Sequence, residues 1–170
     1  MKKFELTSEF VTFLGKTLFR IKALVSFGDV AEGELGGFIE RENNLDQSGD
    51  AWVYGDAWVY GDAQVCGDAR VYGNAWVCGD AQVCGDAQVF GNAWVQNCRD
   101  YSATSCFGSE NRTTTFFRTK DGGISVRCGC FYGTLREFRE KVKERHGDSR
   151  LAKEYLMLAD LMEFRLSKDE

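Results

Sequence analysis

A six-residue alternation of apolar and polar positions dominates the middle of the chain. Between positions 49 and 96 each unit reads Gly, Asp or Asn, Ala, a variable residue, Val, and a second variable residue. In an extended segment the Ala and the Val point to one side, whereas the two variable positions point to the other. A Gly followed by Asp or Asn is a turn signal. The pattern therefore predicts a solenoid of short strands joined by tight turns, with Ala and Val in its core.

Residue types also recur at every third unit, a spacing of eighteen positions. The recurring sets are Trp58, Trp76 and Trp94; Tyr54, Tyr72 and Phe90; and Cys66 with Cys84. If three units make one coil, these residues stack on neighbouring strands about 4.8 Å apart, where their side chains touch. The higher-order spacing thus predicts a three-sided coil.

The repeat resembles the hexapeptide repeat of left-handed parallel β-helix proteins, in which an aliphatic residue of each unit points into a triangular prism. The resemblance covers a little under a third of the chain. It implies a mainly β fold, a left-handed parallel β-helix, and the association into trimers that such helices often show. The positions that match the inward aliphatic residue are Val53, Val59, Val65, Val71, Val77, Val83, Val89 and Val95.

The outer variable positions carry many aromatic residues for a narrow rod. A contiguous apolar surface on a protein usually marks a contact. Other parts of the chain could cover these residues, or sister subunits of a dimer or trimer could pack there; alternatively, they form a partner-binding surface. The candidate surface residues are Trp52, Trp58, Trp76, Trp94, Tyr54, Tyr60 and Tyr72.

The segments before the repeat predict a cover for one end of the solenoid. Residues 17–24 read as a strand, residues 28–30 and 36–39 look like degenerate repeat units, and residues 41–48 read as a polar loop. An open coil exposes unpaired backbone and core, so its end must be covered.

The segments after the repeat predict a small α+β module. Residues 113–119 and 124–128 flank an Asp-Gly-Gly turn and indicate a β-hairpin. Helical spacing follows, with a capping box at Thr134 and a second start at Asp148 or Ser149. The predicted parts are an N-terminal cap at residues 1–27, the β-helix at 28–108, and a ββαα module at 109–170. A hexapeptide rod with such a tail is similar to small proteins of phages and prophages of gut bacteria, which implies a phage origin.

Charge and cysteine content add two expectations. The net charge is -5, with Asp at the repeat corners and many Arg and Lys between positions 111 and 147. The seven cysteines are odd in number, and three of them lie at outward repeat positions where Tyr or Phe also occurs, so we expect reduced thiols that serve as apolar side chains. No signal-peptide pattern or membrane-spanning apolar run is present. We therefore expect a protein of the bacterial cytoplasm, without membrane contact.

The histidine content argues against the enzymes of the resembled family. Many left-handed β-helix proteins are acyltransferases with a histidine base, and others are carbonic anhydrases with a zinc held by three histidines. This chain has one histidine, His146, at the expected C-terminal end of a helix. Cys128 and Cys130 share one face of a strand and lack the usual zinc spacing, so a structural role is favoured over zinc binding. We expect no enzyme, and no catalytic residue, metal site or cofactor.

Two binding mechanisms remain. Basic residues of the C-terminal module could bind phosphate with help from Phe116 and Phe117, although these rings could equally form the module's core. The Asp residues of the repeat could instead imitate a nucleic acid, although Asp at such corners is also favoured by the turn itself. The basic candidates are Arg112, Arg118, Arg127 and Arg136.

The sequence thus leads to a functional hypothesis with three alternatives. The hypothesis is a phage-derived, non-enzymatic inhibitor that binds a bacterial defence factor, such as a CRISPR effector, stoichiometrically. Its partner would be a host nucleic-acid-handling protein or the nucleic acid itself, and the inhibitor would be a homo-oligomer. The alternatives are an acyltransferase-like enzyme with an unusual base, a nucleotide-signal sponge in which Arg118 and Arg127 meet at a pocket, and a purely structural oligomer.

Overall fold

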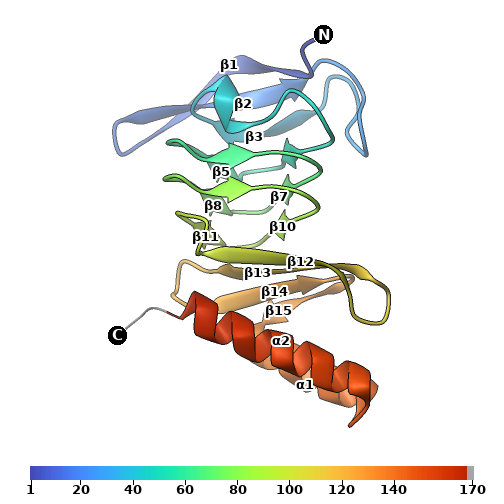
Figure 1. Ribbon diagram of the computed structural model, residues 1–170. Coiled ribbons are helices and arrows are strands. Elements are labelled where there is room, and N and C mark those ends of the chain that lie inside the picture. The colour runs from blue at the N-terminus through green and yellow to red at the C-terminus, as the bar shows by residue number, and fades with distance from the viewer. Residues whose placement is uncertain (168–170) are drawn as a thin grey trace.

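The computed structural model describes residues 1–167 as a short rod of three stacked parts (Figure 1). Antiparallel strands form one end, parallel coils form the middle, and an antiparallel sheet backed by two helices forms the other end. No helix of this part of the chain is both long enough and apolar enough to cross a bilayer.

The N-terminal strands continue directly into the solenoid. Strands β1 (Phe4–Phe13) and β2 (Lys16–Ala23) form a hairpin, which confirms the strand predicted at residues 17–24. Strand β3 (Leu35–Ile39) pairs antiparallel with β2 and parallel with β5 (Trp58–Val59). One sheet therefore runs from the hairpin through the coils, in the order β1-β2-β3-β5-β8-β11.

Strand β3 and eight two-residue strands build the solenoid in three parallel ladders, β3-β5-β8-β11, β4-β7-β10 and β6-β9. Paired residues are eighteen apart within the repeat, so that Trp58 lies opposite Trp76 and Gln64 opposite Gln82. All eight repeat valines and the alanines beside them are fully buried. The structure thus confirms a β-solenoid with an Ala and Val core. Besides β5, the strands are β4 (Trp52–Val53), β6 (Gln64–Val65), β7 (Arg70–Val71), β8 (Trp76–Val77), β9 (Gln82–Val83), β10 (Gln88–Val89) and β11 (Trp94–Val95).

The corner glycines explain why the unit tolerates so little variation at its first position. Gly49 has φ +67°, and a Cβ placed on it would lie 2.5 Å from the carbonyl oxygen of Gly67 in the next coil. Only glycine fits such a corner, because it accepts the left-handed conformation and leaves room for the backbone below.

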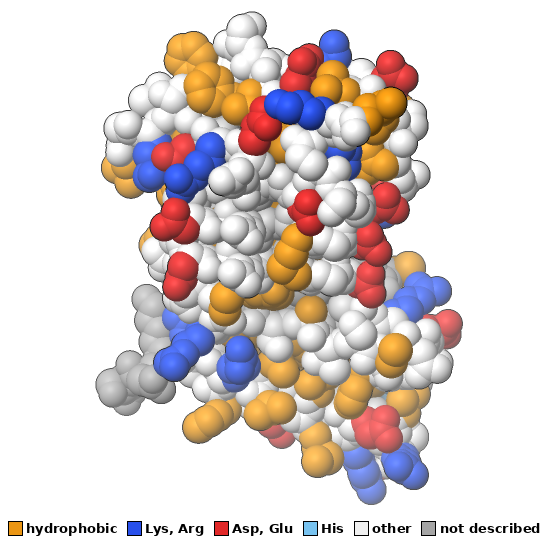
Figure 2. Space-filling model, turned by 45° about the horizontal axis from the view of Figure 1, so that its top comes forward, with side chains coloured by type: hydrophobic (Ala, Val, Ile, Leu, Met, Phe, Trp, Pro, Cys, Tyr) orange, Lys and Arg blue, Asp and Glu red, His pale blue; other side chains and the backbone are white. Residues whose placement is uncertain are grey.

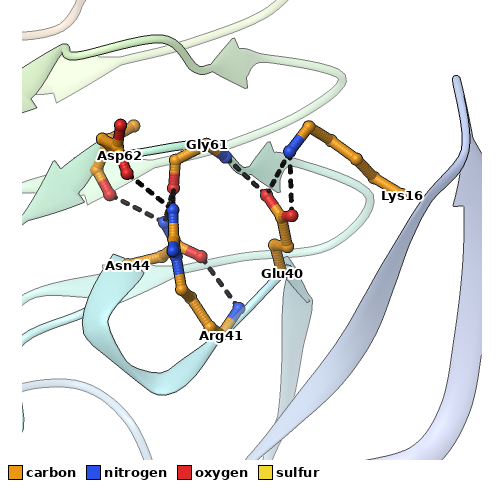
Figure 3. Close-up of polar contacts among 7 residues, drawn as sticks. Lys16, Glu40, Arg41, Asn44, Gly61 and Asp62 are labelled. Carbon is orange, nitrogen blue, oxygen red and sulfur yellow. Dashed lines mark hydrogen bonds and ion pairs between the residues drawn. The ribbon is translucent and has the colours of Figure 1, made fainter.

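The segment predicted as a polar loop takes part in the first coil. It contains a 3-10 turn (Glu42–Asn44), and Leu45 then forms a parallel bridge with Val65. Glu40 binds the ammonium of Lys16 at 2.8 Å and accepts the N–H of Gly61 at 2.6 Å, while Arg41 binds Asp62 at 2.7 Å (Figure 3). These contacts fasten the N-terminal strands to the solenoid.

The C-terminal end is a four-stranded antiparallel sheet with two helices. The predicted hairpin, β13 with β14, is confirmed, and the helices begin after the N-caps Thr134 and Ser149. Two further strands flank the hairpin, and one of them comes from residues that we assigned to the solenoid. The elements are β12 (Tyr101–Phe107), β13 (Arg112–Arg118), β14 (Ile124–Cys128), β15 (Phe131–Thr134), α1 (Leu135–His146) and α2 (Arg150–Leu166).

This sheet separates the solenoid from the helices. Successive residues of β13 face opposite sides, so Phe117 joins the solenoid core whereas Phe116 joins the core under the helices. The last coil would otherwise expose unpaired N–H groups. The hydroxyl of Tyr101 accepts the N–H of Cys84 at 3.3 Å, and that of Thr115 accepts the N–H of Gln88 at 3.0 Å. Side chains of the sheet therefore close the ladder.

Candidate functional site

The tryptophan ladder is covered by the same chain. The rings of Trp58 and Trp76 stack with centroids 5.1 Å apart, which confirms the contact predicted from their spacing. Phe13 packs on both, at 5.2 and 4.9 Å, and the ammonium of Lys120 lies 3.7 Å from the Trp76 centroid. Burial lowers the pKa of Lys120. These two indoles serve internal packing between the solenoid and both ends of the rod.

Our prediction that Trp52 lies on the surface is wrong. It is fully buried, because Phe4 and Phe27 pack edge-on against its ring at 6.2 and 5.3 Å. Trp52 points away from the prism, but the N-terminal segment closes over it. It is not accessible to a partner.

The second ladder runs from the N-terminal segment to the C-terminal module. Tyr54 and Tyr72 stack at 4.6 Å, Phe90 follows at 5.6 Å, and Tyr132 of β15 meets Phe90 at 4.8 Å. Burial, together with a hydrogen bond donated to Asp29, raises the pKa of Tyr54. This ladder too connects parts of one molecule. Trp94 and Tyr60 are likewise partly buried.

Three of the four candidate arginines, Arg118, Arg127 and Arg136, lie apart and do not form a common binding site. Arg118 contacts Asp100 at 3.4 Å, and Arg127 donates to the side chain of Gln88 at 3.1 Å. The register of β13 and β14 puts these two arginines on opposite faces of the sheet, so they do not converge on a pocket. Arg136 is exposed on α1.

The fourth, Arg112, lines a pocket of about 570 Å³ in the C-terminal module. The pocket lies between the β12–β13 turn, the β14–β15 turn and the two helices. Its volume falls in the range of small-molecule sites. The aromatic lining consists of Phe107, Phe131, Tyr132, Phe138, His146 and Tyr155.

Tyr155 holds one wall of the pocket in place. Its hydroxyl accepts the N–H of Ser109 at 3.2 Å, and a Cβ on Gly108 would collide with the same hydroxyl. The His146 ring stacks on Tyr155 with centroids 5.7 Å apart. Burial raises the pKa of Tyr155. The β12–β13 turn is therefore fitted closely to α2.

The charged residues of the pocket are mostly basic. Arg112, Lys141 and Arg145 line it, against one acidic residue, Glu110. Lys141 also binds Glu144 at 2.8 Å, whereas Arg112 and Glu110 are 4.0 Å apart and both largely exposed. Such a rim attracts anions.

The pocket cysteines are not arranged as a metal site. Cys128 accepts a hydrogen bond from the hydroxyl of Thr114 at 3.2 Å, and Cys130 is exposed. Within residues 1–167 no three His, Cys, Asp or Glu side chains come close enough together to hold a metal ion.

Cys66 and Cys84 differ from our expectation of reduced thiols. The structure joins them in a disulfide between successive coils, with Cα atoms 4.7 Å apart. In-register parallel strands place residues eighteen apart at this distance, which lies within the range that a disulfide bridges. The spacing that predicted their stacking was thus also a signal for the bond.

The acidic corners do not form a free ladder along their whole length. Figure 2 shows acidic side chains at both edges of the middle of the rod. Arg41 binds Asp62, and Arg20 lies 3.8 Å from Asp56. Arginines of the N-terminal part therefore neutralise the upper corners.

One uncovered apolar surface lies on α2. Met157, Leu161 and Phe164 are 72%, 57% and 84% exposed, and their spacing puts them on one side of the helix. The opposite side is buried and carries Tyr155, Ala159, Met162 and Leu166. We call the three exposed residues the α2 stripe. The apolar residues on both sides of α2 were a signal for this surface that is visible in the sequence.

Comparison with known proteins agrees with the middle of the fold. Residues 63–79 and 81–97 each match the YdcK beta solenoid repeat. Both segments lie in the coils, so the similarity concerns the solenoid and not the two ends of the rod. No curated protein matches the chain.

Proposed function

We propose that the protein is a non-enzymatic inhibitor that binds a bacterial defence factor stoichiometrically through the α2 stripe. The target is a nucleic-acid-handling protein such as a CRISPR effector, the site of action is the bacterial cytoplasm, and the origin is a phage. The solenoid is the rigid body that carries the binding end.

The exposure of the α2 stripe carries this proposal. Three large apolar side chains face solvent on the side of α2 opposite the core, at the far end of the rod from the N-terminal hairpin (Figure 1). An amphipathic helix with apolar residues at such spacing is a common way to fill a groove of a partner. Exposed patches of this kind mark interaction sites.

Charges around the stripe specify the partner further. Lys153 and Arg165 are exposed beside it, and Arg150 is paired with Glu154 at 3.2 Å. The acidic residues of the neighbouring turns, Asp160 and Glu163, are both bound by Arg139 of α1 at 2.7 Å. Arg139 offsets only one of these two carboxylates, so the surroundings of the stripe carry a small net positive charge. A protein groove that is apolar inside and acidic at its rim fits this surface.

The finer fold assignment belongs to the same proposal. We propose a left-handed coil of the hexapeptide-repeat class. The six-residue unit and the three ladders of two-residue strands support it. We further propose that the protein acts as a homo-oligomer, and since the indoles of Trp58 and Trp76 are covered within one chain, its interface would lie elsewhere.

The test is an affinity capture from bacterial lysate with the wild-type protein, one triple variant and one double variant. The first variant replaces the α2 stripe by serine (M157S/L161S/F164S). The matched control, F10S/L14S, removes exposed apolar residues of the β1–β2 hairpin at the other end of the rod. We expect one defence nuclease at a fixed ratio with the wild type and the control, and its loss with the stripe variant.

Thermal melting separates loss of binding from loss of folding, because the three exposed side chains contribute little to the core. An unchanged capture by a folded stripe variant would contradict the proposed surface. A captured protein without a role in nucleic-acid handling or defence would contradict the proposed target.

A further inference from the structure

The pocket of the C-terminal module is separate from the α2 stripe, and its chemistry indicates a ligand of its own. We infer that this pocket binds a mononucleotide, with the base among its aromatic side chains and the phosphate at its basic rim. The inference does not rest on the proposed inhibitor function.

The shape and lining of the pocket favour a flat aromatic body. Its volume of about 570 Å³ suits a ligand of nucleotide size. Rings rather than aliphatic chains dominate the wall. Phe138 and Tyr155 are buried and pack on each other at 5.8 Å, so the rings left to face a ligand include the partly exposed Phe107, Phe131 and His146. Aromatic side chains bind the π face of any base by stacking. An aliphatic ligand would gain nothing specific from these flat faces.

The rim favours an anionic group. Arg112, from the start of β13, and Lys141 and Arg145, from one side of α1, line the same pocket. Arg145 has no ion-pair partner among residues 1–167. Arg112 and Lys141 each have a carboxylate neighbour, Glu110 at 4.0 Å and Glu144 at 2.8 Å, so the rim has an excess of one cation, Arg145. A phosphate can accept charge-assisted hydrogen bonds from all three side chains.

The β14–β15 turn lies close to Arg112. Gly129 in this turn has φ +56°, and a Cβ there would lie 3.7 Å from a terminal nitrogen of Arg112, an ordinary van der Waals distance. The Ser109 N–H fixes the other arm of the β12–β13 turn to Tyr155, so the rim and the aromatic wall are held together before any ligand arrives. Such preorganisation reduces the entropic cost of binding.

The experiment is isothermal titration calorimetry of the full chain with adenosine 5′-monophosphate as the probe. Adenosine and ribose 5-phosphate test the base and the phosphate separately. The variants are R112Q and R145Q, and the matched control is R136Q, which removes an exposed arginine from the same helix outside the pocket. We expect saturable binding of the probe that weakens about tenfold or more in R112Q and R145Q and stays unchanged in R136Q.

Weaker binding of both adenosine and ribose 5-phosphate than of the whole nucleotide would support the two-part site. No binding of the probe at millimolar concentration would overturn the inference. Equal weakening in all three variants would overturn it as well, because it would indicate a diffuse charge effect. A single-stranded oligonucleotide that binds where the mononucleotide does not would assign the basic rim to a polymer instead.

Discussion

Two polar side chains, Lys3 and Asn44, are buried because they satisfy backbone carbonyls at the upper end of the solenoid. Lys3 donates to the carbonyl of Ala51 at 3.0 Å, and Asn44 donates to those of Gly61 and Ala63 at 3.0 and 2.8 Å. Burial lowers the pKa of Lys3, because a charged ammonium loses hydration inside the protein. Its hydrogen bonds to backbone carbonyls offset this desolvation cost. A polar side chain can thus replace a missing strand.

Glu40 makes the junction between hairpin and solenoid sensitive to acid. Burial raises the pKa of its carboxyl, but the hydrogen bonds from Lys16 and Gly61 outweigh this, so the net pKa lies below the ordinary 4.5. A depressed pKa stabilises the folded state above the unfolded pKa, and this stabilisation is lost as the pH falls through the folded pKa. Below about pH 4.5 the free energy of unfolding should therefore decline.

The E40Q variant tests this prediction. At neutral pH it should be less stable by about 1 kcal/mol, and its melting temperature should fall less steeply with acid than that of the wild type. A urea titration at neutral pH measures the first effect, and thermal melting at several pH values measures the second. The exposed Glu32, replaced in E32Q, is a control that should leave the pH profile unchanged. Parallel acid profiles for E40Q and the wild type would refute the role of Glu40.

At the scale of elements, the disulfide connects two coils on the side of the prism that has the shortest ladder. Strands β6 and β9 form only a pair, whereas the other two ladders are longer. The disulfide closes a loop with a sequence separation of 18, which should stabilise the oxidised protein by about 3 kcal/mol.

The C66S/C84S variant should melt at a lower temperature than the wild type in the absence of reductant. Addition of dithiothreitol should lower the melting temperature of the wild type to that of the variant and leave the variant unchanged. The exposed Cys98 provides a matched control, because the C98S variant should show the same drop in melting temperature on addition of dithiothreitol as the wild type. If mass spectrometry of the unreduced protein found both thiols free, the prediction of reduced cysteines from sequence would stand instead.

Elements with their own periodicity were predictable, and elements defined by distant partners were not. The spacing of Val, Trp and Cys gave the coils and their stacking, and the Asp-Gly-Gly turn gave the β13–β14 hairpin. Strand β12 was missed because Tyr101–Phe107 has no apolar alternation of its own; it becomes a strand by pairing with β13. Tertiary context of this kind overrides local pattern.

The candidate sites follow the same rule. Arg112 was identified as basic, but its place in a pocket depends on α1 and on turns that come together only in the folded chain. Trp52 looked exposed because nothing near it in sequence covers it, whereas Phe4 and Phe27 lie far away along the chain.

For the molecule as a whole, the covered aromatic ladder predicts stability rather than assembly. Replacement of Trp58 and Trp76 by serine removes the indoles that Phe13 and Lys120 cover, and should destabilise the fold by about 2–4 kcal/mol. The oligomeric state should not change as long as the protein stays folded. Light scattering coupled to size-exclusion chromatography and thermal melting measure the two effects.

The matched control is F164S, which removes a far more exposed aromatic residue and should change stability by less than about 0.5 kcal/mol. A tryptophan variant with an unchanged melting temperature and a smaller oligomer would show that these residues form an interface between subunits.

The three-sided coil also restricts how the gene can change in length. Loss or gain of one six-residue unit by replication slippage would move every later strand to the next side of the prism. Strand β11 would then no longer lie under β8, and the side chains of Tyr101, Thr115 and Lys120 would meet the wrong edge of the last coil. Units exchanged in threes shift the sheet and helices by about 4.8 Å along the rod and keep each side of the prism in register, although Phe13 and Lys120 would then no longer share Trp76. The number of repeat units can therefore change by whole coils. The distance between the two ends of the rod is then a heritable quantity that varies in steps of one coil.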